Sequence, residues 1–110
     1  MKRAAIIPLL LTGCAVIPPM APDIPKGWPK LRIETRIASP ERIRQDCRNG
    51  GAAVNYVACA LPSFHEGKCY VYLPHGYTEA LRSHEEGHCK GYSHDDDRTW
   101  AQRVMEANGR

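Results

Sequence analysis

The sequence predicts an α+β domain in which a small three-stranded sheet is combined with a histidine-bearing helix and a C-terminal helix. Three observations predict it. Three short stretches have the residue pattern of strands, two later stretches have apolar residues at helical spacing, and four cysteines follow the N-terminal region. A chain of 110 residues holds one domain at most, and a core of this size benefits from two disulfides.

Residues 1–13 have the pattern of a lipoprotein signal peptide. Two basic residues precede an apolar run at 4–11, which is too short to span a bilayer. Residues 11–14, Leu-Thr-Gly-Cys, are similar to the bacterial lipobox, in which the leader is cut before the cysteine and that cysteine is lipidated. The alternative is a plain cleaved signal with an ordinary cysteine. We therefore expect a bacterial cell-envelope protein held at a membrane by a lipid on Cys14.

Residues 14–29 contain five prolines and few groups able to pack, which predicts an extended tether. Trp28 is the one bulky residue in this stretch, and we expect it to dock on the domain that follows, residues 30–110. Ala15 is not the aspartate associated with inner-membrane retention in enteric bacteria. In a host with two membranes, we expect the outer one, with the domain facing the periplasm.

The first half of the domain predicts two strands and a helix. Residues 31–37 alternate apolar and polar side chains, as a half-buried strand does. Ser39 and Pro40 suit the start of a helix, and Gly50-Gly51 suits its end. A second strand is expected from Val54 to Leu61, ended by Pro62.

The second half predicts a strand and two helices. In the strand at 68–73, three apolar residues fall on one face and two tyrosines on the other. Thr78 is a suitable N-cap for a helix at 79–90. The aspartates at 95–97 are expected to cap a last helix at 98–107, whose apolar stripe includes Trp100 and Met105.

The helix at 79–90 carries the pattern HExxHxxGxxH, from His84 to His94. His84 and His88 are four residues apart and share one face, where two imidazoles can bind a single ion. Glu85 points away from that ion but is close enough to hold a water molecule, which suits a general base. Gly91 permits positive φ, so that the chain can leave the helix and bring His94 to the same ion. Three protein ligands leave one position open, which is typical of catalytic Zn²⁺.

The eleven residues 84–94 resemble the signature of the metzincin clan of zinc metallopeptidases at every fixed position. The resemblance covers about a tenth of the chain. It implies that His84, His88 and His94 are zinc ligands and that Glu85 is the catalytic base. As in other zincins, an acidic residue, Asp95 or Asp96, is the alternative third ligand.

The same resemblance implies a minimal zincin-like fold. In such folds the strand before the active helix is the edge strand along which a peptide substrate is laid; an ordinary core strand is the alternative for residues 68–73. Metzincins also carry a methionine turn beneath the zinc. The only methionine downstream of the motif here is Met105, which is expected inside a helix.

Without Cys14, an even set of cysteines remains in a chain directed to an oxidising compartment, which indicates two disulfides. Four cysteines permit three pairings. We favour Cys69 with Cys89, which would tie the strand before the active helix to that helix, and Cys47 with Cys59.

Charge and the remaining histidines add little. A net charge of +3 with scattered basic residues fits a solvated surface and argues against nucleic-acid binding. His65 is expected on the surface. His75 and Tyr77 lie in a turn, where either could also stabilise the oxyanion of an acyl-transfer intermediate.

Taken together, the sequence predicts a membrane-anchored zinc metallopeptidase that hydrolyses peptide bonds with Glu85 as general base. The expected substrates are peptides or components of the cell envelope, and amidase chemistry on the cell wall is a variant of the same reading. The alternative is a non-catalytic, zinc-stabilised envelope lipoprotein that acts as a binding or assembly module.

Overall fold

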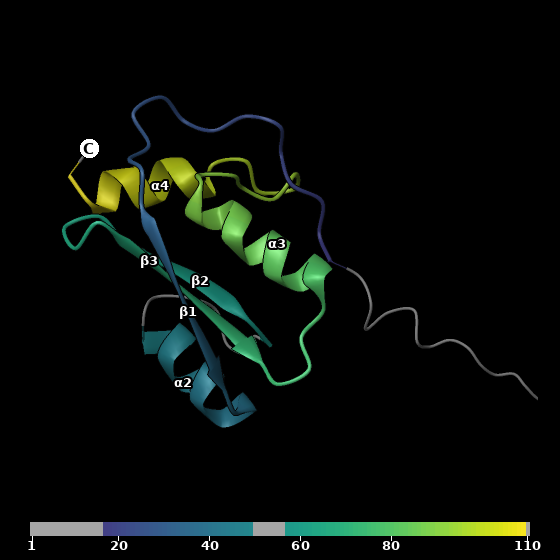
Figure 1. The fold of residues 1–110 in the computed structure, drawn as a ribbon. Coiled ribbons are helices and arrows are strands. Elements are labelled where there is room, and N and C mark those ends of the chain that lie inside the picture. The colour runs from purple at the N-terminus through teal and green to yellow at the C-terminus, as the bar shows by residue number, and fades with distance from the viewer. Residues whose placement is uncertain (1–16, 50–56, 110) are drawn as a thin grey trace, which may run out of the picture.

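The fold is α+β, with a mixed three-stranded sheet, three helices and two disulfides. The computed structural model describes residues 17–49 and 57–109 (Figure 1). The leader, Cys14, and the part of the second expected strand before residue 57 lie outside the described residues. In chain order, the elements are β1 (Arg32–Ala38), α2 (Pro40–Asn49), β2 (Cys59–Ser63), β3 (Lys68–Pro74), α3 (Glu79–Cys89) and α4 (Trp100–Ala107).

The strand that precedes α3 lies in the middle of the sheet. The strand order is β1-β3-β2, with β1 parallel and β2 antiparallel to β3. The expectation that this strand is the edge strand is therefore wrong. Both of its hydrogen-bonding edges are occupied, so no substrate can add to it as a further strand.

Pro62 lies inside β2 rather than ending it. It is paired opposite Cys69 of β3, and within the described residues, which resume at residue 57, β2 starts at Cys59. Because β2 is at the edge of the sheet, a residue without an N–H can be accommodated there without breaking the ladder to β3.

Two small cores lie on opposite faces of the sheet, one under α3 and the other under α2; Figure 1 shows these helices on either side of the sheet. On one face, Val71 and Leu73 of β3 pack with Leu81 and Cys89 of α3. On the other face, Tyr72 of β3 packs with the buried residues of α2. The alternation along β3 was predicted, and it supplies apolar side chains to both cores because successive residues of a strand point to opposite faces.

Each core contains one disulfide, and the pairing is the one that we favoured. Cys47 in α2 is bonded to Cys59 in β2, and Cys69 in β3 is bonded to Cys89 at the end of α3. The second bond fixes the C-terminal end of α3 to the central strand.

The two last helices start differently. Thr78 caps α3 as predicted, since its Oγ1 accepts a hydrogen bond from Leu81 N at 3.1 Å. At α4, the prediction that the aspartates cap the helix is wrong. The helix begins at Trp100, and the Ala101 N–H in its first turn donates to Ser93 Oγ at 2.9 Å instead. Asp97 is paired instead with the exposed Arg103.

Part of the expected tether packs against the domain. Residues Pro19–Trp28, here called the strap, pass over the side of the molecule that carries α3 and α4 before the chain enters β1 (Figure 1). Ala21 is buried, and Trp28 docks on the domain as predicted, with its Nε1 donating to Cys89 O at 3.0 Å. Among the described helices, none has the length and apolar character to cross a membrane.

Candidate metal centre

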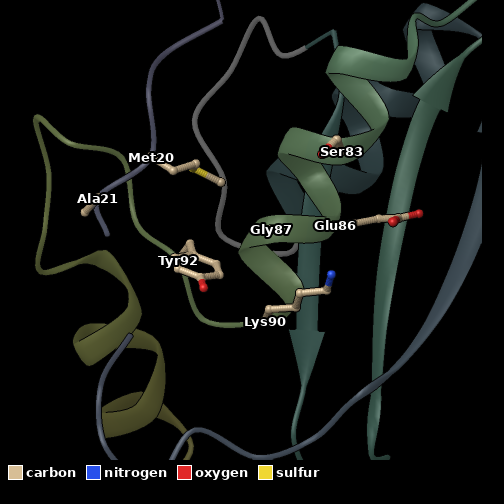
Figure 2. A pocket seen from close by; sticks show the side chains of 7 residues that line it. All are labelled: Met20, Ala21, Ser83, Glu86, Gly87, Lys90 and Tyr92. Atoms are coloured by element: carbon tan, nitrogen blue, oxygen red, sulfur yellow. The ribbon is translucent and has the colours of Figure 1, made fainter. Parts of the chain in front are cut away.

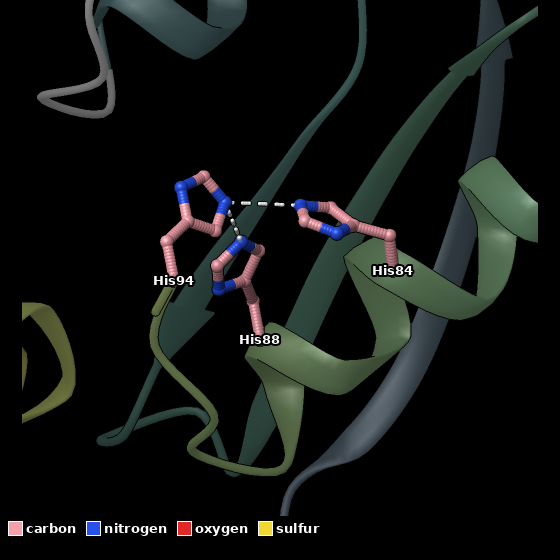
Figure 3. Close-up of side chains that lie close together, drawn as sticks. All are labelled: His84, His88 and His94. Atoms are coloured by element: carbon pink, nitrogen blue, oxygen red, sulfur yellow. Dashed lines mark hydrogen bonds between the residues drawn. The ribbon is translucent and has the colours of Figure 1, made fainter. Parts of the chain in front are cut away.

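Three histidines bring their ring nitrogens together at the C-terminal half of α3 (Figure 3). His84 and His88 project from consecutive turns of α3, and His94 reaches back from the loop that follows. One ring nitrogen from each lies within 4.8 Å of the other two. His94 Nε2 is 3.0 Å from His84 Nε2 and 3.0 Å from His88 Nε2.

These nitrogens fit a tetrahedral metal ion. Ligand bonds of about 2.1 Å at tetrahedral angles place two nitrogens about 3.4 Å apart, a few tenths of an ångström from the two separations of 3.0 Å that involve His94. Three converging imidazole nitrogens also leave lone pairs facing one another, since a single N–H on His94 cannot be well directed at both neighbours. A bound cation satisfies all three lone pairs at once.

His88 is held in the orientation that a metal ligand needs. Its Nδ1 donates to Tyr92 O at 2.8 Å, which leaves Nε2 as the free ligand atom. The ring of Trp100 in α4 packs edge-on against His88, with 4.6 Å between ring centroids. This support from a backbone carbonyl and an aromatic ring fixes both the tautomer and the ring plane.

Burial keeps the imidazoles neutral, which is the form that binds metal. The pKa of His88 is lowered to about 4, chiefly by burial and then by the charge of His84, while the hydrogen bond to Tyr92 O opposes the shift. Burial, followed by the charge of His94, also lowers the pKa of His84. At pH 7, both rings on α3 therefore present a lone pair rather than a second proton.

Glu85 is a buried carboxyl group that has no polar partner among the described residues. Its side chain is only 7 % exposed, and within residues 17–49 and 57–109 it makes no hydrogen bond or ion pair. Burial raises the pKa of Glu85 to about 7. A carboxyl group with a pKa near the working pH can both take up and release a proton, which is the property of a general acid–base catalyst.

Gly91 makes the turn that returns the chain towards His84 and His88. Its φ is +100°, as the motif predicted. A Cβ at this position would stand 2.9 Å from the ring of Trp28. Position 91 therefore requires glycine for a second reason, because the indole leaves no space for a side chain. The close approach of Trp28 was not predictable from the motif.

His94, and neither alternative aspartate, lies with the other two histidines. Asp95 and Asp96 are exposed, and Asp95 is paired with Arg98. The backbone of His94 forms an isolated antiparallel bridge with that of Met20 in the strap. His94 is thus held by a segment more than seventy residues earlier in the sequence.

A shallow hollow of about 300 Å³ lies on the face of α3 next to the histidine face (Figure 2). Ser83, Gly87 and Lys90 form its floor at helical spacing, and Met20 and Tyr92 form the opposite wall. Its volume suits one side chain, and its lining mixes polar and apolar groups. It contains none of the three histidines.

The other candidates from the sequence do not join this group. His65, His75 and Tyr77 are exposed, the last two in the turn before α3. Met105 is buried in α4, where its methyl group lies 3.3 Å from the position of a Cβ on Gly27, so it forms no turn beneath the histidines.

Sequence reasoning missed Ser93, which is 2 % exposed and connects three segments. Its carbonyl accepts a hydrogen bond from Ala21 N at 2.8 Å, while its hydroxyl accepts from Ala101 N of α4. A serine between the glycine and the third histidine has no distinctive local pattern, so only the folded structure assigns this role.

Comparison with protein families, with curated proteins and with solved structures finds no match for this chain. The likeness to metzincins therefore rests on residues 84–94 alone.

Proposed function

We propose that the protein is a zinc-dependent peptidase of the bacterial cell envelope. The observation that carries the proposal is the convergence of His84, His88 and His94 on one point, beside a helix turn that holds the buried, unpartnered Glu85. Structural zinc sites are closed by four protein ligands, whereas three histidines leave a position for water or substrate. When bound, zinc polarises a carbonyl group and lowers the pKa of a water molecule towards 7.

The chain supplies the proton transfers. Glu85 accepts a proton from the attacking water and later gives it to the departing amine, because its pKa of about 7 allows both steps near neutral pH. The hydrogen bond from His88 to Tyr92 O keeps the ligand nitrogen of His88 aimed at the metal position throughout. The hollow lined by Ser83 and Tyr92 is a candidate for a substrate side chain next to the scissile bond.

The proposal includes the membrane anchor. The lipobox-like residues 11–14 and the apolar leader support attachment through Cys14. An envelope location also agrees with the two disulfides, which persist in oxidising compartments. Peptides and cell-wall peptides are then the substrates within reach.

A non-catalytic role is the second candidate, and one observation favours it. His84 and His88 lie on α3 and His94 lies in the following loop, which is hydrogen-bonded to the strap and to α4. An ion bound by the three histidines would therefore link α3, through this loop, to the strap and α4. In that case zinc raises the thermal unfolding temperature but Glu85 has no role in any reaction.

The test compares two glutamates of α3. Glu85→Gln removes the base, and we expect a loss of about 100-fold or more in cleavage of a fluorogenic peptide library, with one zinc per chain retained. Glu79→Gln is the matched control, because the exposed Glu79 pairs with Arg82 in the first turn of α3 and does not line the hollow. Cleavage by Glu79→Gln should equal that of the wild type.

Two results would count against the peptidase. Equal activity of Glu85→Gln and the wild type would exclude Glu85 as the general base. A zinc-loaded wild type that cleaves neither the library nor isolated peptidoglycan would favour the non-catalytic role. The ligands are tested separately by zinc content: His94→Ala should lose the metal, whereas His65→Ala, at an exposed histidine, should keep it.

A further inference from the structure

The strap pairs with the backbone on both sides of His94. Ala21 N donates to Ser93 O at 2.8 Å, and Asp95 N donates to Pro19 O at 2.8 Å. Met20 and His94 stand opposite each other between these two bonds, as in an antiparallel ladder. The third histidine is therefore carried on a two-stranded pairing rather than on a free loop.

The strap is itself fixed at both ends of its contact. Near its start, Ala21 is buried, and the methyl group of Met20 lies 3.0 Å from the place where a Cβ on Gly87 would be. At its end, Trp28 is hydrogen-bonded to Cys89 O and stacks edge-on against Phe64. These contacts hold the strap against α3, the helix that carries the other two histidines.

The loop that carries His94 has further contacts. On the N-terminal side of His94, Tyr92 N donates to Gly87 O at 3.1 Å, and Tyr92 O accepts from His88 Nδ1. Towards its C-terminal continuation, Ala101 N donates to Ser93 Oγ, and Asp97 N donates to His94 O at 3.1 Å. Among the described residues, the strap supplies the two backbone hydrogen bonds that directly flank His94, one to Ser93 O and one from Asp95 N.

We propose that the strap positions His94 and thereby sets the affinity of the metal centre. This inference rests on the proposed metal site and deepens it. A ligand on a loop must be ordered before it binds, and contacts that order it in advance remove that cost from the binding free energy. Residues that orient metal ligands typically change affinity by about 10-fold to 100-fold when they are substituted.

The experiment removes one strap hydrogen bond in the full chain. Ala21→Pro deletes the N–H that donates to Ser93 O, and it creates a Pro-Pro sequence with Pro22. Ile24→Pro is the matched control: it creates the same dipeptide with Pro25, and Ile24 is 47 % exposed and makes no backbone hydrogen bond within the described residues.

Zinc affinity, measured by competition with a chromophoric chelator, is the readout. We expect Ala21→Pro to bind zinc about 10-fold to 100-fold more weakly than the wild type and Ile24→Pro to bind it equally. The absorption spectrum of Co²⁺ bound to Ala21→Pro should also differ from that of the wild type, because the ligand geometry changes. Equal affinities for all three proteins would overturn the strap proposal. A wild type that binds no zinc would instead overturn the metal site itself.

A second measurement uses only the wild type, in case Ala21→Pro does not fold. Coupling between two sites is reciprocal, so zinc must strengthen the strap pairing by the factor by which the pairing strengthens zinc binding. The Ala21 amide should exchange with deuterium about 10-fold to 100-fold more slowly with zinc. The Ile43 amide in α2, across the sheet, is the control and should change less. Exchange at Ala21 that is independent of zinc would refute the coupling.

Discussion

Gly91 shows how one residue can meet two separate demands. Its φ of +100° lets the chain turn out of α3 towards His94, and the missing Cβ leaves room for the indole of Trp28. The first demand is local and can be read from the motif. The second depends on a side chain sixty-three positions earlier, which no local pattern specifies.

Replacing Gly91 by Ala should separate these demands. We expect a loss of about 1–3 kcal/mol from the strained backbone and a further loss because Trp28 must move. Gly76→Ala is the control: its φ is +76°, and nothing lies within 4 Å of the added Cβ. Urea unfolding of both variants measures the difference. Equal destabilisation would show that Trp28 gives way without cost.

Among the elements, α3 is fixed at both of its ends. Thr78 caps its start, the disulfide from Cys89 ties its end to β3, and Trp28 is hydrogen-bonded to its last carbonyl. The disulfide lies one residue after His88. The other disulfide, Cys47–Cys59, joins α2 to β2 on the opposite face of the sheet.

Removing each disulfide should therefore have different effects on metal binding. The bonds close loops with sequence separations of 12 and 20, so each should contribute about 3 kcal/mol to stability. Replacing Cys69 and Cys89 together by Ala should also weaken zinc binding, because the end of α3 is released. The Cys47/Cys59 double variant should retain the wild-type affinity. Both are compared at a temperature at which circular dichroism shows them folded, and equal zinc affinities would contradict the prediction.

At the scale of the whole molecule, local features were predictable and long-range ones were not. Alternation predicted the strands, and capping predicted the start of α3. The spacing of His84, His88, Gly91 and His94 predicted the convergence of the histidines. These features depend on neighbours in the chain. The central position of β3 was left open between an edge strand and a core strand, although Tyr70 and Tyr72 supply the second apolar face that a strand covered on both sides requires. The docking of Trp28 was predicted, but the pairing of the rest of the strap with the loop around His94 was missed. Proline-rich residues indicate only an extended chain, and an extended chain can also serve as a pairing partner.

If Cys14 carries the proposed lipid, the pairing of Met20 with His94 limits the distance between the three histidines and the membrane. Met20 lies six positions after Cys14, and six residues span at most about 21 Å when fully stretched. If Cys14 carries the proposed lipid, energy transfer from a headgroup dye to Co²⁺ at the histidines should be efficient in vesicles, and ten extra Gly-Ser residues after Cys14 should reduce it. Inefficient energy transfer in the wild type would exclude a short connection between the lipid and the three histidines. With so short a connection, the domain would be confined to a thin layer of solvent above the lipid. The segments of other membrane proteins that lie just outside the bilayer would then be the peptides within its reach.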